Sequence, residues 1–170
     1  GSPAVERSGE TEMGDLMADL VRASAKTQIA IINGGGIRDT FPAKTYAPAD
    51  KTLVRPGTNT TGPYDVTLGD AMTVFPFGNY VATTKMTGAD IWAAIENGVS
   101  QYPTAGRFPQ ISGFKFAFDP SKPMGSRVSS IKTLDGKDIP NDKSVTYTAA
   151  TVDYMVSGGD GYVDVFHPTD

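Results

Sequence analysis

The sequence predicts an α+β domain with mixed, mostly antiparallel sheets and helices packed on them. Apolar residues at helical spacing occur in separate segments, and short alternating segments lie between and after them. The two kinds of segment do not follow a strict β-α-β order, which argues against a parallel doubly wound sheet. The chain has 170 residues, and 39% of them are hydrophobic and 20% charged. We therefore predict one globular domain over residues 1–170.

The first predicted helix covers residues 11–25. Its apolar residues recur at positions i, i+3, i+4, i+7 and i+8, the pattern of one helix face. They are Met13, Leu16, Met17, Leu20 and Val21. Residues 28–32 form a short apolar run, which we interpret as a buried strand.

The middle of the chain begins with a segment that lacks periodicity. Residues 42–66 are rich in proline and glycine, which predicts a long surface loop. A short helix over residues 68–74 should follow and end before Pro76. Residues 79–86 alternate well enough to predict a strand.

A second long helix is predicted after Thr87. Thr87 and Asp90 resemble a capping box, in which Thr87 is the N-cap. Ile91, Ile95 and Val99 then form its apolar face.

The C-terminal third is predicted to be mostly strands. Residues 114–118 alternate phenylalanines with Lys115 and Ala117, which indicates a half-buried strand. Further strands are expected over residues 128–134 and 145–148. Asp135-Gly136 indicates a tight turn, and a short helix is expected around residues 152–156.

Composition argues against several classes of function. The net charge of −4 argues against a nucleic-acid partner, and no apolar run reaches the ~20 residues of a membrane span. The chain has no cysteine and a single histidine, His167. Transition-metal sites usually need several such ligands, so we predict no metal site. The Gly1-Ser2 start resembles the remnant of an expression tag, so the lack of a signal peptide says little.

Asn59-Thr60-Thr61 matches the acceptor pattern for N-glycosylation. Such tripeptides are common by chance, so a chance match is the favoured interpretation. A glycan there would require secretion by a eukaryotic cell.

The most informative segment is Asn33-Gly34-Gly35-Gly36-Ile37-Arg38, directly after the first predicted strand. Glycines are useful where a ligand approaches the backbone closely. The loop could offer N–H groups to an anion, and Arg38 could bind phosphate or carboxylate oxygens. It could also be a tight turn with a solvated Arg38. The dinucleotide-binding and P-loop fingerprints are absent.

Three other segments combine glycine with an aromatic or charged residue. They are residues 75–79, 106–113 and 154–161. Phe77 and Tyr154 could stack on a base or fill the core, and Asp160 could hold ribose hydroxyls or only shape a turn. Two aromatics and a carboxylate near an arginine-bearing loop would suit a nucleotide.

The motifs at residues 33–38, 75–79 and 158–161 occur in an order and spacing that resemble a known family. From Glu6 to Phe166 the chain resembles the C-terminal domain of the 5′-nucleotidase family, which includes UDP-sugar hydrolases and 2′,3′-cyclic-nucleotide phosphodiesterases. The resemblance implies the fold of that domain.

The resemblance also implies a set of substrate-binding residues. Two arginines would face the substrate, an asparagine and a glycine of the loop would contact it, two aromatics would sandwich the base, and a carboxylate would hold the ribose. A further asparagine is a weaker match, and the second aromatic is often phenylalanine in the family. The arginines are Arg7 and Arg38, and the loop residues are Asn33 and Gly35. The aromatics are Phe77 and Tyr154, the carboxylate is that of Asp160, and the weaker match is Asn79.

The implied activity is hydrolysis of nucleotide phosphate esters to nucleoside and phosphate. In the family, an N-terminal metallophosphoesterase domain carries two divalent metal ions and the catalytic residues, and that domain is not in this chain. We therefore expect this chain to bind the nucleotide, to have no catalytic residue or cofactor of its own, and to work with that domain. The resemblance implies a secreted, periplasmic or cell-surface protein. The alternatives are a stand-alone nucleotide-binding module and a structural domain that binds nothing.

Overall fold

The computed structural model describes residues 5–57 and 61–166. The Gly1-Ser2 start, the candidate glycosylation site at Asn59 and the histidine His167 lie outside the described residues. The helices are α1 (Glu12–Ala25), α2 (Leu68–Val74), α3 (Gly88–Val99) and α4 (Asp153–Val156), with 3₁₀ turns η1 (Gly34–Gly36) and η2 (Gly159–Gly161). The strands are β1 (Ile29–Asn33), β2 (Val81–Thr87), β3 (Pro109–Ser112), β4 (Phe114–Phe118), β5 (Val128–Thr133) and β6 (Thr146–Val152).

Four strands form a central sheet in the order β2-β6-β1-β3. The β2/β6 and β1/β3 pairs are antiparallel, whereas β1 and β6 are parallel, with Ile29 opposite Ala149. Strands β4 and β5 form a separate antiparallel pair. The predicted α+β class with mixed, mostly antiparallel sheets is confirmed.

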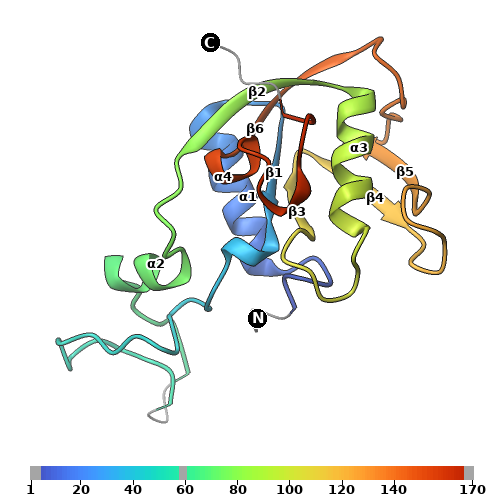
Figure 1. Cartoon of the computed structure of the whole chain (residues 1–170). Coiled ribbons are helices and arrows are strands. Elements are labelled where there is room, and N and C mark those ends of the chain that lie inside the picture. The colour runs from blue at the N-terminus through green and yellow to red at the C-terminus, as the bar shows by residue number, and fades with distance from the viewer. Residues whose placement is uncertain (1–4, 58–60, 167–170) are drawn as a thin grey trace.

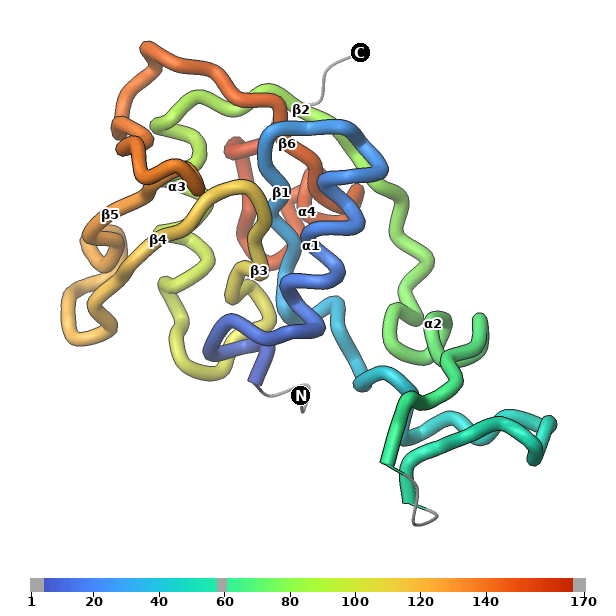
Figure 2. The backbone as a smooth tube through the Cα atoms, turned by 180° about the vertical axis from the view of Figure 1, so that it is seen from behind, coloured from blue at the N-terminus to red at the C-terminus, as the bar shows by residue number. Residues whose placement is uncertain are grey.

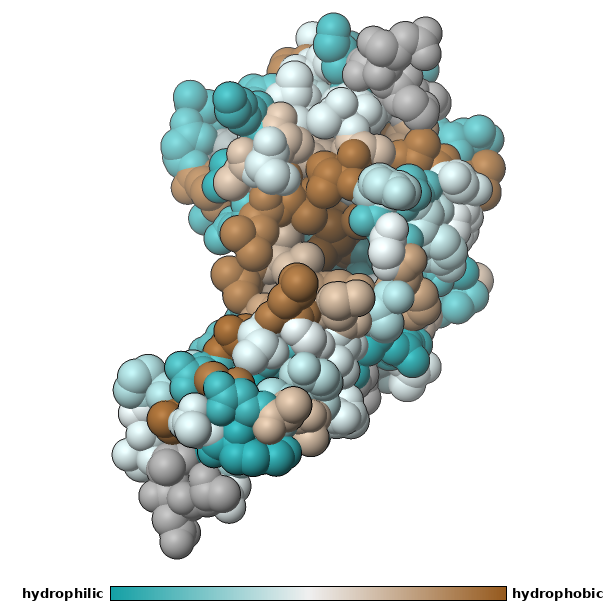
Figure 3. All heavy atoms as spheres, turned by 90° about the vertical axis from the view of Figure 1, so that its left-hand side faces the viewer, coloured by the Kyte–Doolittle hydropathy of each residue, from teal (hydrophilic) through white to brown (hydrophobic). Residues whose placement is uncertain are grey.

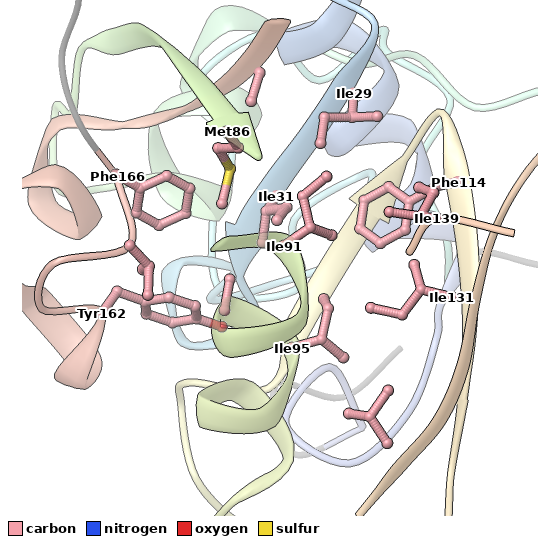
Figure 4. Packing of buried hydrophobic residues seen from close by; sticks show 14 of the residues in the cluster. Ile29, Ile31, Met86, Ile91, Ile95, Phe114, Ile131, Ile139, Tyr162 and Phe166 are labelled. Atoms are coloured by element: carbon pink, nitrogen blue, oxygen red, sulfur yellow. The ribbon is translucent and has the colours of Figure 1, made fainter. Parts of the chain in front are cut away.

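Helices cover both faces of the central sheet (Figures 1 and 2). Strand β1 is buried along its whole length, and its side chains alternate between the faces. Ala30 and Ile32 pack in one cluster with Ala18 of α1. Ile29 and Ile31 point to the opposite face, in the main core. Figure 4 shows this core, in which Ile91 and Ile95 of α3 meet residues of β4, β5 and the C-terminal segment.

Local capping explains where the helices begin. Thr87 caps α3 in a complete capping box with Asp90, as predicted. The same arrangement, Thr67 with Asp70, begins α2, although the sequence analysis did not identify it. At α1, the hydroxyl of Thr11 accepts a hydrogen bond of 3.0 Å from the backbone N–H of Gly14.

The predicted surface loop forms an arm that projects from the body together with α2 (Figures 1 and 2). We define the arm as residues 38–57 and 61–67. The carboxylate of Asp70, at 0% exposure, holds its base together. It accepts bonds of 2.6 and 2.8 Å from the guanidinium of Arg55 and one of 2.8 Å from the backbone N–H of Ala43. These bonds, led by those from Arg55, lower the pKa of Asp70 well below its usual value.

The structure corrects the sequence analysis at one strand. No strand was predicted within residues 106–113, but Pro109–Ser112 form β3, which pairs with β1. A strand of four residues that begins with proline has almost no periodic signal. The other predicted elements are present, and most of their ends lie within two residues of the predictions. The largest difference is at β6, which was predicted to end at residue 148 and extends to Val152.

Candidate functional site

One cavity brings together segments that are far apart in the sequence. Its volume of about 430 Å³ lies within the range of small-molecule sites. Seven of the eight predicted site residues line it, all except Arg38. The lining residues are Arg7, Asn33, Gly35, Gly36, Phe77, Asn79, Gly106, Tyr154 and Asp160.

Asn33 occupies the end of β1, where the strand leaves the sheet. The residue is 6% exposed, and its Nδ2 donates a hydrogen bond of 2.7 Å to Oδ2 of Asp160. Asn33 therefore links the glycine loop to the turn that carries Asp160.

The glycines after Asn33 are needed because backbone segments approach closely. A Cβ on Gly34 would lie 1.8 Å from the carbonyl oxygen of Glu6, and one on Gly35 would lie 2.9 Å from Cα of Gly106. The N–H groups of Gly34 and Gly35 donate to the carbonyls of Phe108 and Gly106, both at 2.8 Å.

The expectation that this loop offers a row of N–H groups to an anion is therefore wrong in part. Besides the two glycines, Ile37 and Arg38 also donate their backbone N–H groups to protein carbonyls. These four donors are already satisfied within the domain.

Arg7 reaches the cavity from a turn that precedes α1. Gln110 of β3, at 1% exposure, holds this turn. Its Nε2 donates to the carbonyls of Glu6 at 3.0 Å and Gly9 at 2.7 Å, and its Oε1 accepts from the backbone N–H of Thr11 at 3.3 Å. A buried glutamine on a central strand thus determines where the Arg7 side chain begins.

The two aromatic residues are exposed at the cavity. Phe77 is 60% exposed and Tyr154 44%, so the alternative that they fill the core is wrong. Gly78 follows Phe77 with φ of +64°, a conformation that favours glycine. Tyr154 lies in α4 next to Met155, which is fully buried and anchors that helix.

Asp160 has a backbone φ of +54°, which is uncommon for a residue other than glycine. The Tyr154 hydroxyl accepts from the backbone N–H of Asp160 at 3.2 Å and donates to its Oδ1 at 3.3 Å. The Asp160 carboxylate thus bonds to Asn33 and Tyr154 across the cavity, and its role goes beyond shaping its own turn.

Arg38 lies beside the cavity. Its side chain is exposed, its Nη1 donates to the carbonyl of Gly35 at 3.3 Å, and its Cζ is 5.8 Å from the centre of the Phe77 ring. At that distance a cation and an aromatic ring attract each other.

Gly106 lines the cavity, yet it was not among the predicted site residues. A Cβ there would lie 3.5 Å from Nη1 of Arg7 and 3.5 Å from Oδ2 of Asp160. The available signal was the glycine in the segment 106–113, which the sequence analysis marked as unusual without assigning a residue.

An apolar groove of about 160 Å³ adjoins the cavity. It shares Asn33, Gly36, Phe77 and Asn79 with the cavity and continues over apolar residues of α1, β1 and β2. Figure 3 shows apolar side chains gathered on the hollowed side of the molecule, between the arm and the body.

The described residues contain no group of three or more histidine, aspartate or glutamate side chains arranged to hold a metal ion. Among the same residues, none of the helices has the length and apolar character needed to cross a membrane.

Comparison with known proteins decides the family. The model of the family described as 5′-nucleotidase, C-terminal domain, matches residues 2–167. The chain belongs to the 5′-nucleotidase C-terminal domain family.

Relatives of this 5′-nucleotidase C-terminal domain are longer proteins. The chain is 35% identical to the trifunctional nucleotide phosphoesterase protein YfkN of Bacillus subtilis, over 92% of this chain and 10% of that protein. It is 31% identical to the cell wall protein Lmo0130 of Listeria monocytogenes, over 90% of this chain and 18% of that protein. A crystal structure of a 5′-nucleotidase precursor from Thermus thermophilus superposes on this domain with a TM-score of 0.78 at 36% sequence identity. The match covers 99% of this chain and 31% of the Thermus chain. The domain thus spans about a tenth to a third of these proteins.

Proposed function

We propose that this domain binds a nucleotide and positions it for a 5′-nucleotidase-type phosphohydrolase. The observation that carries the proposal is the convergence of two exposed aromatic rings, a carboxylate and an arginine on one cavity. Each group suits a different part of a nucleotide, and the loops that bear them come from separate regions of the chain.

The assignment follows the chemistry of each group. Phe77 and Tyr154 would stack on the two faces of the base. The Asp160 carboxylate would accept hydrogen bonds from the ribose hydroxyls, since it has about four acceptor positions and two protein donors occupy only part of them. Arg7 and Arg38 would bind phosphate oxygens. Asn33 and Asn79 would donate to the sugar or base, and the backbone of Gly35 would contact the ligand.

The reaction would be completed by a separate N-terminal metallophosphoesterase domain, with two divalent metal ions that activate water and hold the phosphate. The length of the relatives supports this part of the proposal, since the domain spans only 10% of YfkN and 31% of the Thermus protein. The names of both describe action on nucleotides. Because the relative Lmo0130 is named a cell wall protein, we also propose a secreted, periplasmic or cell-surface location for this protein.

Titration of the isolated domain with adenosine, AMP and ribose 5-phosphate tests the binding proposal. Without the metal-bearing domain we expect nucleoside and nucleotide Kd values of about 0.1–10 mM, which correspond to about 3–5 kcal/mol. Ribose 5-phosphate lacks a base and should bind more weakly than AMP. Chemical-shift perturbation by NMR should place the changes at Phe77, Tyr154 and Asp160. A failure to observe saturable binding at ligand concentrations well above the millimolar range would contradict the proposal.

The alternative of a stand-alone nucleotide-binding module predicts the same titration. The gene distinguishes the two, because the proposed enzyme requires a metallophosphoesterase encoded upstream of this domain. An open reading frame without one would favour the module.

A further inference from the structure

Asp160 depends on a second set of side chains that lie behind the cavity. It sits between Gly159 and Gly161 with φ of +54°, in the left-handed region that residues other than glycine adopt only uncommonly. Such a conformation persists only where surrounding contacts impose it. Tyr154 bonds to the backbone N–H of Asp160 from the cavity side. The partner of the carbonyl is a different residue, which does not line the cavity.

Asn97 of α3 supplies that partner. Its Nδ2 donates a hydrogen bond of 3.2 Å to the backbone carbonyl of Asp160. Asn97 does not line the cavity. Within the described residues, the hydrogen bonds of the Asp160 carboxylate come from Asn33 and Tyr154, and none comes from Asn97. It therefore acts on the backbone conformation, which determines where the carboxylate points.

Arg107 determines which way the Asn97 amide faces. Its Nη1 donates to Oδ1 of Asn97 at 3.1 Å and to Oγ of Ser100 at 3.2 Å. A guanidinium has donors only, so it must meet the amide oxygen. The NH₂ group of Asn97 is then directed to the Asp160 carbonyl.

The surroundings keep this contact in place. The hydroxyl of the buried Tyr162 donates to the carbonyl of Arg107 at 2.7 Å, which ties the segment before β3 to the turn of Asp160. A Cβ on Gly161 would lie 3.1 Å from Oδ1 of Asn97 and 3.2 Å from Nη1 of Arg107. Gly161 therefore lets the turn lie directly against the pair, and its φ of +78° also favours glycine.

We infer that Asn97, oriented by Arg107, is a positioning residue that holds the Asp160 carboxylate toward the ribose of a bound nucleoside. The inference rests on the proposed function, because it assigns Asp160 to the sugar. Asn97 thereby contributes to discrimination between ligands with and without ribose hydroxyls.

The test compares adenosine with 2′,3′-dideoxyadenosine, which lacks both hydroxyls. Asn97→Ala removes the donor. Asn97→Asp has nearly the same shape and can still pair with Arg107, but it also lacks the donor, so it serves if Asn97→Ala folds poorly. Asn141→Ala, at an exposed position before β6, is the matched control.

Both Asn97 variants should bind adenosine about 2- to 10-fold more weakly, the range of one hydrogen bond. Their affinity for dideoxyadenosine should equal that of the unmodified domain. Asn141→Ala should change neither the affinity for adenosine nor that for dideoxyadenosine. A merely structural role would weaken both ligands equally. Equal loss, or no loss, would overturn the inference.

A measurement without ligand separates this inference from the proposed function. The Cα, Cβ and amide shifts of Asp160 report its positive φ, and they should change in both Asn97 variants and stay constant in Asn141→Ala. Unchanged Asp160 shifts would overturn the positioning role. Absence of nucleoside binding by the unmodified domain would instead overturn the proposed function and the assignment of Asp160 to ribose.

Discussion

Asn33 and Asp160 lie 127 positions apart in the sequence, yet Nδ2 of one donates to Oδ2 of the other at 2.7 Å. The bond joins the end of a central strand to a turn near the C-terminus. Because the acceptor is a carboxylate, the bond is of the charge-assisted type, which is shorter and stronger than a neutral one. It couples two of the loops that line the cavity.

A double-mutant cycle tests this coupling. Asn33→Ala should lower the free energy of unfolding by roughly 1–3 kcal/mol, the range for hydrogen bonds to charged groups. In an Asp160→Ala background the same substitution should cost clearly less, because its partner is already absent. Denaturant unfolding of the four proteins measures this difference. Additive effects of the two substitutions would show that the bond contributes nothing to stability.

Phe77→Ala should weaken nucleoside binding and leave the fold intact. Base–aromatic stacking contributes about 1–3 kcal/mol per base, so the affinity should fall at least several-fold. The ring is 60% exposed, so its loss creates no cavity in the core. A binding titration and a melting curve measure the two effects.

Phe114→Ala is the matched control for this substitution. Phe114 is 4% exposed in the main core, so its removal should cost about 3–5 kcal/mol of stability. A loss of stability in Phe77→Ala as large as that in Phe114→Ala would contradict the placement of Phe77 at the ligand.

The isolated domain should show no phosphatase activity toward AMP, UDP-glucose or a cyclic nucleotide. The described residues hold no cluster that could bind a metal ion, and the proposed hydrolysis depends on metals in another domain. Added zinc, manganese or cobalt should not produce turnover. Phosphate release is the measurement, and metal-dependent release that copurifies with the domain would contradict the expectation.

Acid should loosen the arm through Asp70. Bonds from Arg55, outweighing the opposing effect of burial, and further bonds from Thr67 and Ala43 lower the pKa of this carboxyl in the folded state. Its contribution to stability is therefore fully present above the unfolded pKa of about 3.9 and is lost as pH falls toward the lower folded value. The protection factors of the arm's amides, which correct for the slower intrinsic exchange in acid, should fall below about pH 4.

Asp70→Asn separates this effect from general acid unfolding. The variant lacks the charge that pairs with Arg55, whose side chain is 16% exposed, so the base of the arm should be less stable than in the unmodified domain. Its arm should exchange faster already at neutral pH, with less further change on acidification. An arm in Asp70→Asn with the same exchange rates and pH profile as the unmodified domain would refute this role.

Elements with a strong local signal could be predicted from the sequence. The repeat of apolar residues predicted α1, although Leu16 and Leu20 of the predicted face are exposed, because the buried face runs through Met13, Gly14, Ala18 and Val21. The Thr87-Asp90 box begins α3 through bonds between residues three positions apart. Such interactions act within one segment, so they can be recognised before any tertiary contact is known. The motifs at residues 33–38, 75–79 and 158–161 likewise indicated the family, which the comparison confirmed.

Only the tertiary structure decided how these segments meet. Strand β3 is short and exists because β1 pairs with it, and the parallel contact of Ile29 with Ala149 joins segments from opposite ends of the chain. Whether Phe77 lies in the core or on the surface depended on what surrounds it. The same holds for Gly106 and Asn97, whose positions near Asp160 arise from long-range packing. Local sequence carries no record of such neighbours, because burial and long-range hydrogen bonds are properties of the assembled fold.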